Sequence, residues 1–446
     1  MAGDFYNEAQ KFFHGKKVTM LGLGVLGRGV GVAEFLHECG AHLTITDLKT
    51  KKELISSLAR LAKFKGIQYV LGRHDISNFQ DTDLVIKAAG VPMNSPYILK
   101  AKKNNIPVFM DASLFAKFFK GTIIGITGTR GKTTTTYLIY EILKNAKKRV
   151  HLGGNIKGMA TLPLLKKAEK EDFVVLELDS WQLQGFGDAK ISPHISVFTN
   201  FYEDHMNYYE GDMERYFGDK AHIFLHQKKE DFLICGDQIA KSLKTKSKKI
   251  IAKKEDIPKN WKLELVGGHN KENASCAYHA GKVLDIRDSI IKKTIEKFPG
   301  VPGRLELVGN HKGIHFCNDT TATVPLATQN AICALEGKPI ILIAGGTDKN
   351  LNYKDLAKDI SRSIKNLIFL PGTATEKLKK ALPKKFLYKE ARSMKEAFSH
   401  AMKKGKKGDV ILMSPGAASF GLFKNEYDRG EKFLTEIKRL KKKKKR

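Results

Sequence analysis

Long apolar runs, a leader pattern and paired cysteines are all missing from this chain of 446 residues. No stretch of ~18 consecutive apolar residues occurs, so we expect no membrane-spanning helix. The N-terminus lacks a basic start followed by a long apolar core, so we expect no cleaved secretion signal. The cysteines form no CxxC pair, which favours reduced thiols in a cytoplasmic protein over a disulfide scaffold. They are Cys39, Cys235, Cys276, Cys317 and Cys333.

Acidic residues are scarce relative to basic ones: 47 Asp and Glu stand against 78 Lys and Arg, which gives a formal net charge of +31. Such a charge attracts nucleic acid, anionic lipid and acidic small molecules. The lysines are spread over the whole chain, however, and no basic module interleaved with aromatic residues is present, so we expect no specific nucleic-acid partner. Only Lys441–Arg446 forms a block of cations. This block is either a solvated tail or a weak contact with an anionic membrane surface, worth about 1 kcal/mol per residue.

The length predicts about three domains of ~150 residues each. Apolar strand-like segments alternate with helical ones, and polar motifs follow the strands, which is typical of an α/β protein with mostly parallel sheets. We expect a Rossmann-like domain over residues 1–111, a central P-loop ATPase-like domain over 112–300, and a C-terminal Rossmann-like domain with the basic tail over 301–446. The predicted strands are Val18–Leu21, Leu43–Thr46, Leu84–Ala88, Pro107–Met110, Phe173–Leu178, Ile195–Phe198, Ile340–Ala344 and Val410–Met413.

The segment Gly125–Thr133, GITGTRGKT, has the pattern of a phosphate-binding loop. An apolar β-branched run precedes it, and an amphipathic helix is predicted over Thr134–Leu143 behind it. Its inner glycines allow the backbone to curl around an anion, while Lys132 supplies a positive charge and Thr133 a hydroxyl suited to magnesium. Ile126 replaces the first glycine of the strict Walker A pattern, so the loop has a shorter G-T-x-G-K-T form. We interpret it as a triphosphate-binding loop rather than a solvated turn.

A second glycine-rich motif, GLGVLG at Gly22–Gly27, follows the first predicted strand. A helix-like stretch comes next, and the following strand ends in Asp47 about 20 residues on, where a carboxylate could meet a ribose or a base. A single GxGxxG motif is weak evidence, because NAD, FAD and UDP-sugars all suit such a helix N-terminus. These residues alone leave the ligand of the first domain open.

Two residues that follow central strands are candidate metal ligands. Glu177 ends an apolar strand downstream of the phosphate loop, where a carboxylate commonly completes a magnesium shell; an ordinary strand-end carboxylate is the alternative. His205 follows the next strand, either as a metal ligand or as a turn residue. Lys220 is expected to be a surface lysine on a helix, since nothing in its surroundings in the sequence distinguishes it.

Polar residues further along the chain are candidates for ligand contacts. Asn270 and Asn273 lie one helical turn apart, so their amides either face one ligand edge or cap a helix. Arg304 and Asp319 lie near the start of the third segment, where a forked guanidinium could reach phosphate oxygens. Lys349 follows a double glycine and is either an anion contact or a solvated loop lysine.

Ten short motifs occur in one order along nearly the whole chain. They are GLGVLG at Gly22, GTRGKT at Gly128, GGN at Gly153, ELDSWQL at Glu177, TNFYEDH at Thr199, GGHNKENA at Gly267, VPGR at Val301, NDTTAT at Asn318, GGTDKN at Gly345 and SPGAASFGLFKNEYDRG at Ser414. In this set and order the chain resembles the Mur ligase family, and most closely the members that add D-glutamate to UDP-N-acetylmuramoyl-L-alanine (UDP-MurNAc-L-Ala) in peptidoglycan precursor synthesis. The resemblance implies that ATP phosphorylates a carboxylate of the nucleotide-linked substrate and that an incoming amine attacks the acyl phosphate.

The resemblance also implies which residues contact each substrate. The UDP-sugar contacts are Gly24, Val25, Leu26, Gly27, Asp47, Gly90 and Asn155. The ATP contacts are Gly128, Thr129, Arg130, Gly131, Lys132, Thr133, Thr134, Asn270, Asn273, Arg304 and Asp319. The contacts with the incoming amino acid are Thr323, Lys349 and Ser419, with Lys349 matching its side-chain carboxylate. Three domains would then have to close on one another.

Two magnesium sites follow from the same resemblance, one at Thr133 and Glu177 and the other at His205 and Lys220. The family lysine that matches Lys220 is carbamylated, which turns a cation into a carboxylate-like metal ligand. The resemblance gives the catalytic roles to Lys132, His205 and Lys220.

Four positions depart from the family pattern. Arg130 stands where asparagine is usual, and Asp179 stands where serine is usual. Thr321 replaces a lysine that is frequent in the D-glutamate branch, and Glu426 replaces an aromatic residue of the amino-acid pocket. Losing a cation and gaining an anion disfavour a dicarboxylate acceptor. A related ligase with L-glutamate or another acceptor therefore stays open, as does a non-catalytic nucleotide-binding protein.

Overall fold

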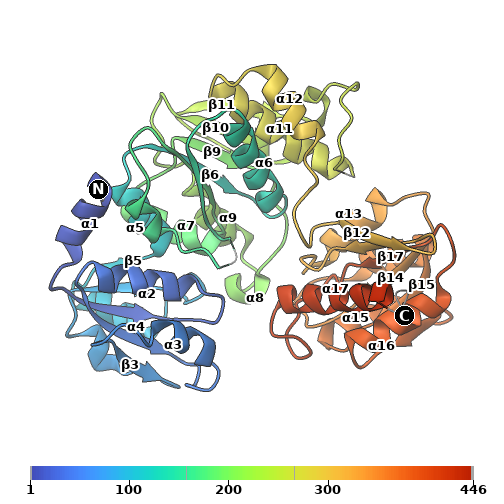
Figure 1. Cartoon of the computed structure of the whole chain (residues 1–446), viewed down its shortest axis with the longest axis horizontal. Coiled ribbons are helices and arrows are strands. Elements are labelled where there is room, and N and C mark those ends of the chain that lie inside the picture. Colours follow the sequence, from blue (N-terminus) through green and yellow to red (C-terminus); the bar gives the residue numbers. More distant parts are fainter. Residues whose placement is uncertain (1–2, 157, 266, 443–446) are drawn as a thin grey trace.

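The computed structural model describes residues 3–156, 158–265 and 267–442, which form three α/β units in sequence order (Figure 1). Each unit is built on one sheet flanked by helices, and the strands are mostly parallel, as the sequence predicts. The boundaries expected after residues 111 and 300 remain predictions. Among the described helices, none combines the length and the apolar character needed to cross a membrane.

The first sheet has five parallel strands in the order β3-β2-β1-β4-β5. Its strands are β1 (Lys17–Leu21), β2 (His42–Asp47), β3 (Gln68–Leu71), β4 (Leu84–Lys87) and β5 (Val108–Phe109). The helices of this part are α1 (Asp4–Phe13), α2 (Arg28–Glu38), α3 (Ile55–Leu61), η1 (Ile76–Phe79), α4 (Pro96–Lys103) and α5 (Asp111–Phe118). The strand order reverses direction at β1, so the loop after β1 opens at the switch point where such sheets bind ligands.

The central sheet has six parallel strands in the order β11-β10-β9-β6-β8-β7. Its strands are β6 (Thr122–Thr127), β7 (Val150–Gly154), β8 (Phe173–Glu177), β9 (Ile195–Phe198), β10 (Phe232–Gly236) and β11 (Lys248–Ala252). Its helices are α6 (Lys132–Asn145), η2 (Leu162–Lys166), α7 (Ser180–Ala189), α8 (Met206–Tyr209), α9 (Met213–Ala221), α10 (Asp237–Ala240), η3 (Lys254–Asp256), α11 (Gly268–Val283) and α12 (Asp288–Glu296). Because β6 pairs with both β8 and β9, the loop after β6 lies between the residues that end those two strands.

The third sheet has six strands in the order β12-β13-β17-β14-β15-β16, parallel except for the β12–β13 hairpin. Its strands are β12 (Glu306–His311), β13 (Ile314–Asn318), β14 (Ile340–Ala344), β15 (Ile364–Phe369), β16 (Tyr388–Glu390) and β17 (Val410–Met413). Its helices are α13 (Pro325–Ala334), α14 (Lys354–Ser363), α15 (Thr373–Ala381), α16 (Met394–Lys404) and α17 (Glu426–Lys442).

Apolar side chains join the three units. The rings of Phe13 in α1 and Phe118 in α5 lie 6.1 Å apart, within one core that also contains residues of the first and central sheets. Met206, Tyr209 and Tyr216 of the central unit belong to a core of the third unit. The α8–α9 region therefore packs against the third unit, and the segment between β9 and α9 lies where two units meet.

Candidate functional site

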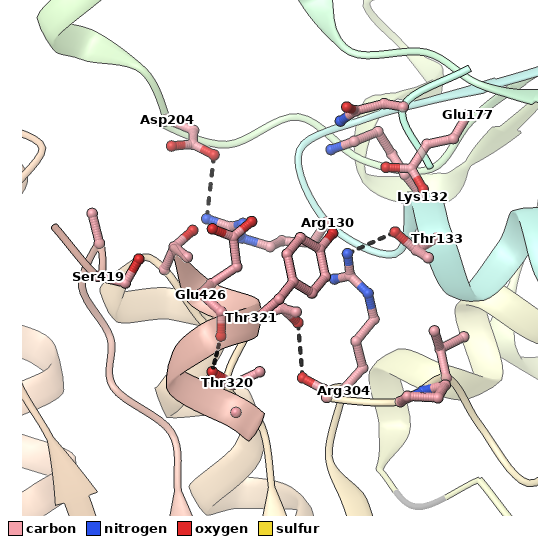
Figure 2. A pocket seen from close by; sticks show the side chains of 18 of the residues that line it. Arg130, Lys132, Thr133, Glu177, Asp204, Arg304, Thr320, Thr321, Ser419 and Glu426 are labelled. Carbon is pink, nitrogen blue, oxygen red and sulfur yellow. Dashed lines mark hydrogen bonds and ion pairs between the residues drawn. The ribbon is translucent and has the colours of Figure 1, made fainter. Parts of the chain in front are cut away.

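A cavity of about 930 Å³ lies where the three units meet, lined by the phosphate loop, by Leu26 and Asn155, and by residues of the third unit. Figure 2 shows the part of it between the phosphate loop and the third unit. Of the residues predicted from the sequence, the cavity brings together Leu26, Thr129, Arg130, Gly131, Lys132, Thr133, Asn155, Glu177, His205, Arg304, Thr323, Lys349 and Ser419. Its lining does not include Gly24, Val25, Gly27, Asp47, Gly90, Gly128, Thr134, Lys220, Asn270, Asn273 and Asp319.

The phosphate loop follows β6, and α6 begins at Lys132, two residues earlier than the sequence predicts. Gly131 has φ +81°, and a Cβ there would lie 2.0 Å from Asn273 Oδ1. The backbone is held by Asn200, whose Oδ1 accepts from Arg130 N at 2.8 Å and whose carbonyl accepts from Thr129 N at 2.9 Å. The first N–H groups of α6 have no partner within the helix, so they suit an anion.

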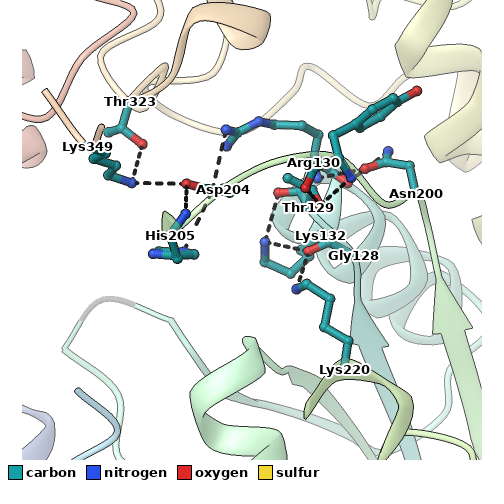
Figure 3. Close-up of polar contacts among 11 residues, drawn as sticks. Gly128, Thr129, Arg130, Lys132, Asn200, Asp204, His205, Lys220, Thr323 and Lys349 are labelled. Atoms are coloured by element: carbon teal, nitrogen blue, oxygen red, sulfur yellow. Dashed lines mark hydrogen bonds and ion pairs between the residues drawn. The ribbon is translucent and has the colours of Figure 1, made fainter. Parts of the chain in front are cut away.

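Lys220 is not a surface lysine, contrary to the expectation from the sequence: it is only 1% exposed. Its Nζ donates to the carbonyl oxygen of Gly128 at 2.9 Å (Figure 3). The same nitrogen lies 4.9 Å from the centre of the Tyr216 ring. Lys132 Nζ donates to the same carbonyl, also at 2.9 Å. Burial and the neighbouring charge of Lys132 lower the pKa of Lys220 well below its ordinary value. The sequence could not show this, because α9 buries Lys220 only by packing under the loop.

The residues at the first predicted magnesium site fit a hard cation. Glu177 is buried, and its Oε2 has no hydrogen-bond partner among the described residues. Thr133 lies in the same cavity, and its hydroxyl accepts a hydrogen bond of 2.6 Å from the Arg304 guanidinium. In the described part of the chain, no group of three His, Cys, Asp or Glu side chains could hold a metal by itself. Magnesium at nucleotide sites needs only one or two carboxylates, because phosphates and waters complete its shell.

His205 lies in a left-handed turn with φ +57°, and its ring packs 4.7 Å from that of Trp181. Burial lowers the pKa of His205 to about 4. The imidazole is therefore neutral near pH 7, the form in which histidine binds a metal.

The amides of Asn270 and Asn273 lie in the first two turns of α11 and are both buried. Asn273 Nδ2 donates to Asn270 Oδ1 at 3.0 Å, and the helix has Gly267 as its N-cap with no side-chain cap. Gly267, and neither asparagine, is thus the N-cap residue of α11, and contact of the two amides with a ligand remains a prediction. The pair lies beside the phosphate loop at Gly131.

Asp47 organises the glycine loop of the first unit. Its Oδ2 accepts from the backbone N–H groups of Leu23 at 2.8 Å and Gly24 at 2.9 Å, and its Oδ1 accepts from Lys49 N at 2.9 Å. Contact with a ribose or a base remains a prediction for this residue. A link to the central unit that sequence reasoning missed runs from Arg28 Nη2 to Asn155 Oδ1, at 2.8 Å.

Asp319 lies at the end of β13 and is buried. It accepts from Leu305 N at 3.0 Å and from Ser414 Oγ at 2.7 Å. Burial raises the pKa of Asp319 to about 6. Both carboxylate oxygens thus have partners inside the protein, and its contact with nucleotide remains a prediction.

Thr323, Lys349 and Ser419 form the end of the cavity on the third unit. Lys349 Nζ lies 3.4 Å from Thr323 Oγ1 and 3.5 Å from Asp204 Oδ1. Asp204 itself was missed by sequence reasoning. In the sequence, only its position next to His205 after β9 could have indicated a role. Its two cationic neighbours, Arg130 and Lys349, come from distant segments.

Arg429 was also missed, although it is fully buried in α17. Its guanidinium donates to the carbonyl oxygens of Thr320 at 2.8 Å and Ala417 at 3.0 Å. It therefore ties together the two loops that carry Thr323 and Ser419.

The four residues that depart from the family pattern lie in different surroundings. Asp179 is the N-cap of α7 and forms a capping box with Gln182. Thr321 donates to the Gly303 carbonyl at 3.0 Å, and Glu426 begins α17 and lines the cavity. Arg130 lies 3.5 Å from Asp204 through Nη2.

Three α/β units that place a phosphate loop, cationic side chains and an isolated buried carboxylate around one cavity define a multidomain nucleotide-binding protein. Three family models match it in order: Mur ligase MurD-like, N-terminal domain, over residues 16–110; Mur ligase middle domain over 126–260; and Mur ligase, glutamate ligase domain, over 303–416. The chain belongs to the Mur ligase family.

Its relatives include UDP-N-acetylmuramoylalanine--D-glutamate ligases. That of Roseiflexus sp. (strain RS-1) is 33% identical over 464 residues, covering 94% of this chain and 97% of the relative. That of Borreliella burgdorferi (strain ZS7) is 35% identical over 447 residues, with the same coverage of 94% and 97%. The fold resembles that of UDP-N-acetylmuramate-alanine ligase MurC from Thermotoga maritima, with a TM-score of 0.63, 19% identity, and coverage of 95% of this chain and 99% of that one.

Proposed function

We propose that the chain is an ATP-dependent ligase that joins D-glutamate to the L-alanyl carboxylate of UDP-MurNAc-L-Ala, a step of peptidoglycan precursor synthesis. The observation that carries this proposal is that one cavity is lined by the phosphate loop, by Asn155 and by the group of Thr323, Lys349 and Ser419. A nucleotide, a carboxylate and an amine can meet only where the three units face the same space. The names of the relatives support the choice of substrates.

The reaction has two steps. The γ-phosphoryl group of ATP passes to the alanyl carboxylate, and the amine of D-glutamate then attacks the acyl phosphate and releases phosphate. Lys132 and the N-terminus of α6 stabilise charge on the transferred phosphoryl group and on the departing ADP. Lys349 holds the side-chain carboxylate of the acceptor, and closure of the three units over the substrates keeps water from the acyl phosphate.

We assign Thr133 and Glu177 to one magnesium site and His205 and Lys220 to another. Magnesium would neutralise phosphate charge there. Carbamylation of Lys220 joins its neutral amine to CO2 and releases one proton, which leaves an anionic oxygen ligand. The lowered pKa of Lys220 favours the neutral amine that this step needs.

The test is release of phosphate with ATP, magnesium and UDP-MurNAc-L-Ala, measured with a panel of amino acids. We expect turnover with D-glutamate and none without UDP-MurNAc-L-Ala. Turnover with L-glutamate or another amino acid, and none with D-glutamate, would instead identify a related ligase with a different acceptor, the alternative raised by Thr321 and Glu426. No turnover with any acceptor, together with retained ATP binding, would identify a non-catalytic nucleotide-binding protein.

We place the reaction in the cytoplasm, where ATP and UDP-linked precursors are available. We further propose that the cations at 441–446 hold the protein weakly at an anionic membrane surface. Residues 443–446 of this block lie outside the described part of the chain. Deletion of 441–446 should reduce co-sedimentation with phosphatidylglycerol vesicles and leave phosphate release in solution unchanged; equal co-sedimentation would contradict the contact.

A further inference from the structure

The side chain of Arg130 leaves the phosphate loop to which its backbone belongs. Its N–H and carbonyl are bonded to Asn200 and Thr199, which hold the loop in shape. Its guanidinium lies 3.5 Å from Asp204, and Nε and Nη2 are buried without a hydrogen-bond partner among the described residues. The Arg130 side chain as a whole is 20% exposed, but donors that are buried without a partner are costly unless a ligand accepts from them.

Asp204 lies between Arg130 and Lys349, with one oxygen 3.5 Å from each cation (Figure 3). Asp204 is therefore an anion that two cations share. Taken by themselves, these three side chains carry one net positive charge beside Thr323.

The rest of the lining makes this excess charge significant. The lining carboxylates are Glu177, Asp204, Glu306, Asp348, Glu426 and Glu431, and the lining lysines and arginines are Arg130, Lys132, Arg304 and Lys349. Lys132 donates to the loop carbonyls and Arg304 donates to Thr133. Of these four lining cations, Arg130 and Lys349 are thus the two at the acceptor end. Glu426 adds a negative charge near Arg130 (Figure 2). Without Arg130, that end would carry two carboxylates against one lysine and would repel a dicarboxylate.

We infer that the Arg130 side chain binds the α-carboxylate of the acceptor amino acid and that Asp204 is a positioning residue for both Arg130 and Lys349. This inference rests on the proposed function. The reacting amine and the α-carboxylate share one carbon atom, so that carboxylate must lie on the side of the phosphate loop, from which Arg130 extends. Lys349, on the third unit, then holds the side-chain carboxylate. The forked guanidinium matches a carboxylate in a way that a lysine does not.

The test compares wild type with Arg130→Asn in steady-state kinetics. Loss of a charge-assisted hydrogen bond should raise KM for D-glutamate about 10-fold to 100-fold and leave KM for ATP within about threefold. With D-glutamine, which keeps the α-carboxylate, the same penalty should persist. With the α-amide of D-glutamate the penalty should disappear, because the carboxylate that Arg130 binds is already absent. Arg130→Lys should recover part of the affinity.

Asp204→Asn tests the positioning role. It should raise KM for D-glutamate more than KM for ATP, and Asp204→Glu should restore part of the loss. The inference is overturned if Arg130→Asn leaves KM for D-glutamate unchanged, or if KM for ATP rises as much, which would assign the guanidinium to the nucleotide. Thermal unfolding of each variant, with its midpoint close to that of wild type, shows that folding is not the cause. If the wild type itself does not turn over D-glutamate, the proposed function fails rather than this inference.

Discussion

The carbonyl oxygen of Gly128 accepts hydrogen bonds from two buried lysines, Lys132 and Lys220, each with its Nζ at 2.9 Å. Burial lowers the pKa of both amines, and the charge of Lys132 lowers the pKa of Lys220 further. Two full positive charges in such a place repel, so the environment favours one neutral amine. Lys220 is the more suitable, because carbamylation would replace its charge by the opposite one.

The first prediction follows from this pair. In the presence of ¹³C-labelled bicarbonate, the wild type should show a carbamate signal by NMR that Lys220→Arg abolishes. Ligase activity should fall about 100-fold in that variant, because an arginine cannot supply the anionic oxygen. Lys87→Arg is the control, since burial also lowers the pKa of Lys87, to about 8, at a site away from the phosphate loop. Persistence of the signal in Lys220→Arg would contradict the assignment.

The second prediction concerns Gly131. Its φ of +81° and the 2.0 Å approach of a Cβ to Asn273 Oδ1 mean that Gly131→Ala must displace either the loop or α11. A shift of about 1 Å at such a site costs about 100-fold in kcat/KM for ATP. Gly66→Ala separates this effect from backbone strain, because Gly66 has φ +82° with nothing within 4 Å of a Cβ. Equal activity of the two variants would show that the contact with Asn273 is unimportant.

The third prediction concerns pH. The pKa of Asp319 is about 6 in the folded protein and 3.8 ordinarily, so folding favours the protonated carboxyl. Protonated Asp319 therefore stabilises the fold by about 3 kcal/mol. This contribution is fully present below pH 3.8 and is lost as pH rises through about 6. The free energy of opening of β13 and β17, measured by hydrogen exchange, should therefore be lower at pH 8 than at pH 4. Asp319→Asn should remove most of the difference; an unchanged difference would contradict this origin.

The fourth prediction concerns Arg429. Burial lowers its pKa to about 10, so it remains charged near neutral pH while it donates to Thr320 and Ala417. Arg429→Met should leave those carbonyls unsatisfied, at about 1–3 kcal/mol each, and should raise KM for the acceptor because the loops that carry Thr323 and Ser419 come apart. The thermal midpoint and KM are the measurements. Lys432→Ala, on an exposed part of the same helix, should change neither.

Much of the fold could be predicted from local sequence, because the central strands are short apolar runs and are buried on both faces. The prediction of Ile195–Phe198 is confirmed to the residue, as are those of Ile340–Ala344 and Val410–Met413. The edge strand β16 was missed for the opposite reason: it is the exposed segment Tyr388–Glu390, and no apolar pattern distinguishes it from a loop.

The sequence by itself determined the phosphate loop and the order of the motifs, because strand, glycines, lysine and helix are contiguous and their chemistry is local. Only the tertiary structure decided which distant side chains meet. Lys220 is 92 residues from Gly128, and Asp204 is 145 residues from Lys349. The charge and burial of such residues depend on how α9 and the third unit pack, which no local pattern records. The same packing places Arg130, a departure from the family pattern that the sequence left unexplained, at the acceptor end of the cavity.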